Sequence, residues 1–409
     1  MIVVRGCSLY IGGLKASSIA EEFGTPLYVY DEDTVARRAE EVLSSTRGVV
    51  SQVLYSLKAN PNPYIAHTLY SMGLGLEAVS PGEVILAVRL GADPSRIMFT
   101  GSSVSLEDLE IVLGYGVEVN VDSASAARKL CRLGYRGAVG VRVNPRFGAG
   151  YHRYTVTGGR RVKFGVAMDE LRGVVEELRS CGIAVKRLHA HMGSGISDPG
   201  MYLELLKLLV RLAREVGGIE ELDLGGGFAV PYRRGDPRFP WRLFSEMLRS
   251  AVEELEAGEY RLIIEPGRYL VAESGVLLAR VTDVKVVDGV FIAGTDTGMN
   301  HLIRPALYGA YHEAVLADRM CEEASAVVDI VGNLCESGDV LAQNRHLPPP
   351  REGDVVAILN AGAYGISMAS NYNMRPLPPE VVVDRARRAI LVRRRQGFEK
   401  LLENFVWWP

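Results

Sequence analysis

The stretch Tyr55-Ser-Leu-Lys-Ala-Asn60 places Lys58 at the end of a β-like run whose apolar residues are Val49, Val50, Val53 and Leu54, and just before Asn60-Pro61. Such a run is typical of a buried β-strand, and Asn-Pro is a turn signal. A lysine at this point lies at the rim of a sheet, where α/β folds bind ligands. A partly desolvated amine there can form a Schiff base with a carbonyl cofactor, although a plain surface lysine is the commoner meaning of the motif by itself.

Strand and helix signals alternate around this stretch, from about residue 25 to about residue 274. The expected strands are the run before Lys58 and residues 26–30, 76–79, 97–100, 117–121, 138–143, 185–190, 222–224 and 262–265. Eight or more strand–helix units in roughly 250 residues are typical of a (β/α)8 barrel. We therefore predict an α/β fold in which residues 25–275 form a TIM-type barrel. An open doubly wound sheet is the alternative, because periodicity does not show closure.

The pattern changes after Ser274, where apolar segments with glycine and proline punctuation replace the alternation with helices. Strand-like segments cover residues 276–286, 290–293, 326–331 and 355–361. We predict that residues 276–409, together with residues 1–24, form a second, mainly β domain. Residues 342–352, which include three consecutive prolines, are expected to form a surface loop.

The composition is that of an ordinary globular protein. Its 409 residues are 48% hydrophobic and 23% charged, and the net charge is −3. Charges of both signs are interspersed, so no basic stripe predicts nucleic-acid binding and no polybasic run predicts binding to anionic lipid. No segment approaches the roughly 20 apolar residues of a membrane span, and the first residues lack the pattern of a secretory leader. We expect a cytoplasmic protein without nucleic-acid or membrane partners.

The five cysteines are scattered along the chain and show no CxxC or metal-ligand spacing. We therefore expect neither a disulfide framework nor a zinc site. Four cysteines are expected to be buried as small hydrophobic residues, namely Cys7, Cys131, Cys181 and Cys321. The fifth, Cys335, belongs to a motif discussed below.

The segment His189-Ala-His-Met-Gly-Ser-Gly195 follows a predicted strand. Histidines at positions i and i+2 point to the same side of a strand, so a metal site is conceivable, but no third ligand is evident nearby. We predict no metal. An active-site histidine, His191, followed by a phosphate-binding turn with Ser194 fits better. The alternative is a pair of structural histidines at a strand end.

Two further motifs follow predicted strands of the barrel. A triple-glycine turn, Gly225-Gly226-Gly227, lets backbone N–H groups approach an anion closely and is the predicted phosphate cradle. In Glu265-Pro-Gly267-Arg268, a carboxylate beside a pyridine nitrogen favours the protonated ring, and the arginine can bind a phosphate or carboxylate. A structural turn and a solvent-facing Glu–Arg pair are the alternatives.

The predicted β domain contributes three more candidate motifs. Arg304 lies within the apolar run 302–308, where a charge is costly unless it meets an anion. The motif Cys335-Glu336 combines two groups. The thiol can donate a proton, and the carboxylate can bind an ammonium group. Tyr364 offers a phenol on a small-residue turn. Packing alone could explain any one of these motifs.

Taken in order, these motifs resemble those of the fold-type III pyridoxal-phosphate enzymes, and within them the diaminopimelate decarboxylases. The resemblance runs from residue 24 to residue 376. It rests on seven ordered motifs: 55–60, 191–194, 225–228, 265–268, 304–308, 335–336 and 361–364. It implies an alanine racemase-like architecture, a barrel with a β domain, and a homodimer with shared active sites.

The resemblance also implies residue roles. Lys58 would bind the aldehyde of pyridoxal 5'-phosphate, His191 would stack on its ring, and Glu265 would face the ring nitrogen. The groups around the phosphate would be Ser194, Gly225, Gly226, Gly227, Gly267, Arg268 and Tyr364. Cys335 would be the proton donor. Both Cys335 and Glu336 would reach the active site of the partner subunit.

The implied reaction is decarboxylation of meso-2,6-diaminopimelate to L-lysine. The substrate-binding residues would be Arg268, Arg304, Tyr308, Glu336 and Tyr364. Arginine is the residue type that carboxylate recognition favours, which supports a diamino diacid over a simple diamine precursor. The alternatives are decarboxylation of ornithine, arginine, lysine or carboxynorspermidine, an amino-acid racemase, and a non-catalytic pyridoxal-phosphate-binding protein. A racemase has no need of an acid at position 265.

Overall fold

The computed structural model describes residues 1–150, 152, 157–159 and 162–408. The chain divides into two compact units, which are described separately. The barrel unit comprises Arg38–Val230 and Pro237–Leu270. The sheet unit comprises Met1–Arg37, Pro231–Asp236 and Val271–Pro409.

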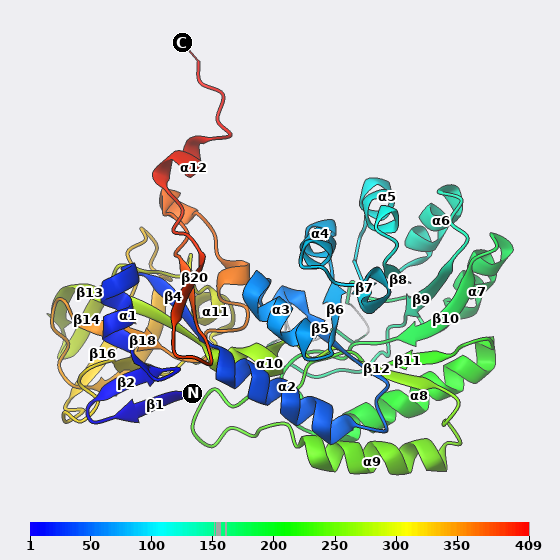
Figure 1. Ribbon diagram of the computed structural model, residues 1–409, viewed down its shortest axis with the longest axis horizontal. Helices are drawn as coiled ribbons and strands as arrows, with labels where there is room; N and C mark the ends of the chain where they lie inside the picture. The colour runs from blue at the N-terminus through cyan, green and yellow to red at the C-terminus, as the bar shows by residue number, and fades with distance from the viewer. Residues whose placement is uncertain (151, 153–156, 160–161, 409) are drawn as a thin grey trace. The chain divides into compact units, whose positions relative to one another are not determined.

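The barrel unit contains a closed ring of eight parallel strands (Figure 1). In chain order these are β5 (Gln52–Ser56), β6 (Gly75–Ala78), β7 (Ile97–Phe99), β8 (Glu118–Val121), β9 (Ala138–Arg142), β10 (Ala184–His189), β11 (Glu221–Asp223) and β12 (Arg261–Ile264). Pairing of β12 with β5 closes the ring. The predicted TIM-type barrel is therefore confirmed, and the open sheet is excluded.

Helices separate the strands and lie outside the ring (Figure 1). They are α3 (Pro63–Ser71), α4 (Pro81–Arg89), α5 (Leu106–Gly114), α6 (Ala124–Arg132), α7 (Leu171–Ser180), α8 (Gly200–Val216) and α9 (Trp241–Glu254), while α2 (Glu32–Thr46) precedes β5. Side-chain caps fix several starts: Ser105 and Asp108, for example, form a capping box at α5. Among the described residues, no helix has both the length and the apolar character needed to cross a membrane.

Charged side chains line part of the ring. Side chains two apart on a strand share a face, so Arg187 and His189 of β10 lie on the same side. The strand register pairs them with Glu221 and Asp223 of β11. Arg187 is only 1% exposed and forms ion pairs with Glu221 and Glu118. Charged side chains are thus buried within the barrel as well as placed at its rim.

The sheet unit is built on β13 (Gly275–Val287), which pairs with three other strands. Its nine-stranded sheet also contains β4 (Leu27–Asp31), β14 (Val290–Thr295), β15 (Ala314–Leu316), β16 (Ala326–Val331), β17 (Val340–Leu347), β18 (Val355–Ile358), β19 (Glu380–Val383) and β20 (Ala389–Arg393). A small sheet of β1 (Ile2–Arg5), β2 (Ser8–Ile11) and β3 (Leu14–Lys15) and helix α1 (Ala16–Phe23) complete its core. The predicted mainly β second domain is confirmed.

Two local predictions are wrong. The strand expected at 26–30 forms as β4, but it pairs with β13 and β19 in the large sheet rather than opening the barrel series. The loop expected at 342–352 is largely strand β17, which lies at the end of the sheet path. An edge strand tolerates polar residues because one side faces water, so its sequence looks like a loop.

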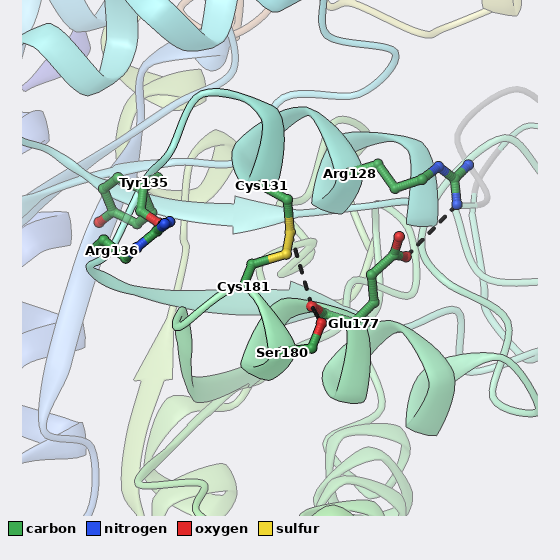
Figure 2. Close-up of a disulfide and its surroundings, with 7 residues drawn as sticks. All are labelled: Arg128, Cys131, Tyr135, Arg136, Glu177, Ser180 and Cys181. Carbon is green, nitrogen blue, oxygen red and sulfur yellow. Dashed lines mark hydrogen bonds and ion pairs between the residues drawn. A yellow bond between two sulfur atoms is a disulfide. The ribbon is translucent and has the colours of Figure 1, made fainter.

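Four cysteines form two disulfides, contrary to the expectation from their spacing. Cys131 of α6 is bonded to Cys181, which caps α7, with Cα atoms 5.5 Å apart (Figure 2). An ion pair joins the same two helices, with Nη1 of Arg128 lying 3.7 Å from Oε2 of Glu177 (Figure 2). In the sheet unit, Cys7 and Cys321 are bonded across 314 positions of sequence. Separations of this size leave no local pattern, so only the fold brings the partners together.

Candidate active site

Lys58 lies two residues beyond the end of β5, in the short 3-10 helix η1 (Leu57–Ala59). Its Nζ atom is 3.0 Å from Oε2 of Glu77, which is in the neighbouring strand β6. The lysine side chain is 35% exposed, whereas that of Glu77 is 1% exposed. A buried carboxylate therefore holds a reachable amine at the carboxyl end of the barrel strands, where such barrels carry their active sites.

His191 lies on the segment after β10 and is held as a neutral ring. Burial, then the positive charges of Lys58 and Arg142, lower its pKa well below the ordinary value. Its Nδ1 atom accepts a hydrogen bond from the Gly226 N–H group at 3.1 Å. A neutral planar ring fixed in this way is suited to stacking on a flat aromatic ligand.

The triple-glycine turn follows β11 and packs directly against two other turns. Gly225 and Gly227 have positive φ angles of 65° and 100°. A Cβ atom at Gly226 would lie 2.2 Å from the Glu265 carbonyl oxygen, and one at Gly227 would lie 2.2 Å from that of Gly193. No side chain fits in this space, so the turn requires glycine. Two of its N–H groups already donate within the barrel, Gly225 to Asp223 Oδ1 and Gly226 to His191 Nδ1, which makes the Gly227 N–H group the candidate donor of the turn to a ligand.

Arg268 and Ser194 meet beside the glycine turn. The Nε and Nη2 atoms of Arg268 donate to the Ser194 hydroxyl at 3.2 and 3.0 Å. At Gly267, an added Cβ atom would lie 3.0 Å from Ser56 Cβ and 3.1 Å from Ala59 Cβ, so this turn packs against the segment that carries Lys58. A guanidinium, a hydroxyl and glycine N–H groups are the donors that a phosphate group requires.

Glu265 directly follows β12 and is 4% exposed. Its Oε2 atom lies 3.1 Å from Nε2 of His189. Burial raises the pKa of Glu265, but His189 and Lys58 outweigh burial, so the pKa stays well below its usual range. Within the described part of the chain, Oε1 has no hydrogen-bond partner. A buried anionic oxygen without a donor fits the N–H group of a protonated pyridine ring.

Asp223 is fully buried at the end of β11. Its Oδ1 atom accepts a hydrogen bond from the Gly225 N–H group at 2.9 Å, while Oδ2 has no partner within the described chain. One ligand atom from each of Asp223, His189 and Glu265 lies within 4.8 Å of the others. The sequence showed no third metal ligand near His189, whereas the fold brings carboxylate oxygens of Asp223 and Glu265 close to it. However, Nε2 of His189 and Oε2 of Glu265 are already hydrogen-bonded to each other.

Arg304 begins helix α11 (Arg304–Tyr308) of the sheet unit and is 1% exposed. Its Nη1 atom is 2.7 Å from Nε2 of His312, and its guanidinium lies 4.5 Å from the ring centre of Tyr232. Arginine only donates, so Nε2 of His312 accepts and its Nδ1–H group donates to the Leu359 carbonyl at 2.9 Å. Tyr308, at the other end of α11, is partly exposed.

Cys335 and Glu336 are exposed on the segment between β16 and β17. The Cys335 N–H group donates to Asn373 Oδ1 at 2.8 Å, which fixes the backbone beside the thiol. Tyr364 has a φ angle of 56°, a conformation that is uncommon for a tyrosine and is often found at functional sites.

The predicted residues fall into two groups. The barrel unit brings together Lys58, His191, Ser194, Gly225, Gly226, Gly227, Glu265, Gly267 and Arg268, and the sheet unit carries Arg304, Tyr308, Cys335, Glu336 and Tyr364. Sequence reasoning missed Glu77 and Arg142, which have the signal of a charged residue within an apolar strand. It also missed Asp223, which carries the same signal between Leu222 and Leu224, and His312, for which no local signal exists.

Comparison with known proteins decides the family. A sequence model of pyridoxal-dependent decarboxylases, describing their pyridoxal binding domain, matches residues 32–272, which is more than half of the chain. The chain belongs to this decarboxylase family. Pyridoxal phosphate is therefore its cofactor, and the donors described above fit that group.

Relatives within the family extend over the full chain. The diaminopimelate decarboxylase of Methanothermobacter thermautotrophicus is 40% identical, with 97% of this chain and 95% of the relative covered. That of Pseudomonas aeruginosa is 37% identical, with 97% and 96% covered. The structure of the M. jannaschii diaminopimelate decarboxylase in complex with L-lysine is 30% identical, has a TM-score of 0.90 and covers 99% of this chain and 98% of that one.

Proposed function

We propose that this decarboxylase removes CO2 from meso-2,6-diaminopimelate and yields L-lysine. The observation that carries the proposal is the barrel cluster: a lysine amine paired with a buried glutamate, a side-chain-free glycine turn beside Arg268 and Ser194, and an unpartnered oxygen of Glu265. These are the groups that a pyridoxal phosphate with a protonated ring requires. The similarity to diaminopimelate decarboxylases over nearly the full chain supports the choice of substrate.

Within this proposal each barrel residue has a physical task. Lys58 attaches the cofactor covalently, and His191 covers the ring as a neutral imidazole. The glycine turn, Ser194 and Arg268 bind the phosphate through uncharged and charged donors. Bound pyridoxal phosphate supplies an electron sink for the electron pair left when the C–C bond to the carboxylate breaks. Glu265 keeps the ring nitrogen protonated, which makes that sink stronger.

The sheet-unit residues serve the substrate. Arg304, with Arg268, binds the distal carboxylate of the diamino diacid, and Glu336 and Tyr308 receive its distal ammonium group. The Cys335 thiol donates the proton that replaces CO2 on the α-carbon. By the family resemblance, Tyr364 would be one of the groups that bind the phosphate. The family resemblance supports a homodimer in which Cys335 and Glu336 complete the partner's site, and a cytoplasmic location.

The rival functions differ in the charge they need at two positions. A racemase gains nothing from an anion at the ring nitrogen, so the buried Glu265 disfavours it. Decarboxylases of lysine or ornithine act on substrates without a distal carboxylate. A lysine/ornithine decarboxylase of Vibrio vulnificus shares the fold, with a TM-score of 0.78, but is only 22% identical. Arg304 is therefore the residue that would distinguish the diamino diacid from lysine and ornithine as substrates.

The test is CO2 release by the cofactor-loaded protein from meso-diaminopimelate, L-lysine, L-ornithine and L-arginine, with lysine followed as the product. We expect release from the diamino diacid to exceed the others by at least about 100-fold, because a site built for a polar group rejects analogues that lack it. Arg304→Leu should lower kcat/KM for the diacid by about 100-fold, while Arg351→Leu, an exposed arginine of the same unit, should not. Faster release from ornithine or arginine, or an unchanged preference in Arg304→Leu, would reject the substrate assignment.

A further inference from the structure

Asp223 is a buried carboxyl group for which the proposed mechanism has no task. It is 0% exposed and lies in the same cluster as Glu265, which is 4% exposed. The two carboxyl groups come from neighbouring strands, β11 and β12, and their oxygens lie within 4.8 Å of each other. Two anions this close in a buried site cannot both be stable.

The hydrogen bonds around the pair indicate which carboxyl group carries a proton. Glu265 receives a hydrogen bond from His189 Nε2 at 3.1 Å, a strong reason for it to remain anionic. Asp223 receives only the Gly225 N–H group at 2.9 Å, and its second oxygen has no partner among the described residues. A side-chain hydrogen bond with Glu265 is among the causes of the raised Asp223 pKa, so the Glu265 carboxylate is an acceptor for an O–H group on Asp223.

The surrounding charges agree with this assignment. The charged or titratable groups that act on the pair are Lys58, Arg142, Arg187, His189 and His191. The two cations that act on Asp223 are shared with other acids: Arg187 with Glu118 and Glu221, and Arg142 with Glu265, Asp122 and Glu77. Burial first, and then the charge of Glu265, raise the pKa of Asp223 well above its ordinary value.

We propose that Asp223 is a neutral carboxylic acid at physiological pH and that, with His189, it is a positioning residue for Glu265. Asp223 donates an O–H hydrogen bond and His189 an N–H hydrogen bond to the same carboxylate. Glu265 then remains the only anion of the pair, with its orientation fixed and one oxygen left for the ring nitrogen. The link to the ring nitrogen rests on the proposed function, whereas the proton on Asp223 is a property of the cofactor-free protein.

Infrared spectroscopy of the cofactor-free protein tests the proton directly. Aspartate labelled with 13C in its side-chain carboxyl shifts the C=O band of a neutral aspartic acid. We expect a label-sensitive neutral-carboxyl band at about pH 7.5, above the ordinary pKa of aspartate. The band should be absent in Asp223→Asn. It should be retained in the matched control, Asp339→Asn, because Asp339 is another buried aspartate with a raised pKa.

A second variant keeps the test valid if Asp223→Asn does not fold. Glu265→Gln removes the neighbouring charge, so the labelled band should disappear at a lower pH than in the unchanged protein. The proposal is overturned if no label-sensitive band exists, if the band survives in Asp223→Asn, or if Glu265→Gln leaves its titration unchanged. None of these results depends on whether the protein binds pyridoxal phosphate or releases CO2.

The positioning role is tested on the holoenzyme by cofactor affinity and by the pH dependence of cofactor absorbance. Asparagine and glutamine retain an N–H donor, so Asp223→Asn and His189→Gln should stay close to the unchanged protein. Asp223→Ala and His189→Ala should weaken binding by about 10- to 100-fold, the usual effect of losing a hydrogen bond to a charged group. Equal losses in the conservative and alanine variants would overturn the role.

Discussion

Burial and neighbouring charges together decide the charge of the individual site residues. Burial and nearby cations keep His191 neutral, whereas His189 and Lys58 keep Glu265 anionic although it is buried as well. Nearby positive charge lowers the pKa of both groups, which leaves the imidazole, a base, neutral and the carboxyl group, an acid, anionic. The residue types could be found from the sequence, but these charge states depend on distances that only the folded barrel sets.

Replacing Glu265 tests the most important of these charges. Glu265→Gln keeps the shape of the side chain but removes the anion that holds the proton on the ring nitrogen. We expect kcat to fall by about 100-fold or more, with cofactor still bound. The measurement is kcat for CO2 release together with the absorption spectrum of the bound cofactor. Glu253→Gln, on the exposed face of α9, is the control, and a kcat equal to that of the control would contradict this role.

At the scale of elements, three turns meet where the parallel strands end. The turns after β10, β11 and β12 contact one another through backbone atoms, because a Cβ atom at Gly226 or Gly227 would overlap a carbonyl oxygen. Glycine is therefore required there by packing as well as by ligand approach. Packing therefore accounts for the triple-glycine motif, and its role in binding phosphate stays a prediction.

Gly226→Ala should disrupt this junction. Its Cβ atom would lie 2.2 Å from the Glu265 carbonyl oxygen, so the phosphate-binding turn must move. We expect the Kd for pyridoxal phosphate to rise by at least about tenfold, as when one hydrogen bond to a charged group is lost. The matched control is Gly114→Ala in α5, where an added Cβ atom meets nothing within 4 Å. Equal cofactor affinity in the two variants would contradict the assignment of this turn.

Helix α4 gives a prediction about pH. Burial, and less strongly the charge of Glu77, raise the pKa of Glu83 to about 7, against the Val79 N–H hydrogen bond and the charge of Lys58. The folded state therefore keeps a proton that the unfolded state loses above its ordinary pKa. The stability of the cofactor-free protein should fall as the pH rises from about 4.5 to about 7.

Glu83→Gln cannot ionise but still accepts from the Val79 N–H group, so it should remove this part of the fall. Thermal unfolding at about pH 5 and about pH 7.5 measures the effect. Glu107→Gln, an exposed residue in the first turn of α5, should keep the full pH dependence. The prediction fails if Glu83→Gln and Glu107→Gln show the same fall.

The sequence predicted the elements better than their partners. The alternation of strands and helices gave the barrel, because each strand of a parallel sheet is apolar and is followed by a helix. The partners of β4 could not be predicted, since Leu27–Asp31 is as apolar as a barrel strand. Edge strand β17 resembled a loop, and the cysteine pairs were too far apart in sequence to be recognised. Contacts between residues far apart in sequence, such as the hydrogen bond between His189 and Glu265, could be identified only from the folded structure.

At the scale of the whole molecule, each compact unit has its own covalent cross-link. The Cys131–Cys181 bond lies in the barrel unit and the Cys7–Cys321 bond in the sheet unit. Structural disulfides are rare in the cytosol except in hyperthermophilic archaea and bacteria, where they are common. The cross-links are therefore compatible with the proposed cytoplasmic location only in a cell of that kind.

Removing the barrel cross-link should destabilise the protein. The bond closes a loop with a sequence separation of 50 residues, and such bonds typically contribute about 2–4 kcal/mol to the free energy of unfolding. The double variant Cys131→Ser with Cys181→Ser should show a lower thermal midpoint under oxidising conditions. Cys335→Ser, which removes the exposed free thiol, is the control. Equal midpoints for the two variants would show that the bond contributes nothing.

The claim on which the account depends is that Lys58 holds pyridoxal phosphate in the barrel. The most direct measurement is borohydride reduction of the cofactor-loaded protein, proteolysis and mass spectrometry of the peptides. The account predicts one phosphopyridoxyl group per chain, located on the peptide that contains Lys58, and none in Lys58→Ala. A group located on another lysine, or an unchanged yield in Lys58→Ala, would contradict it.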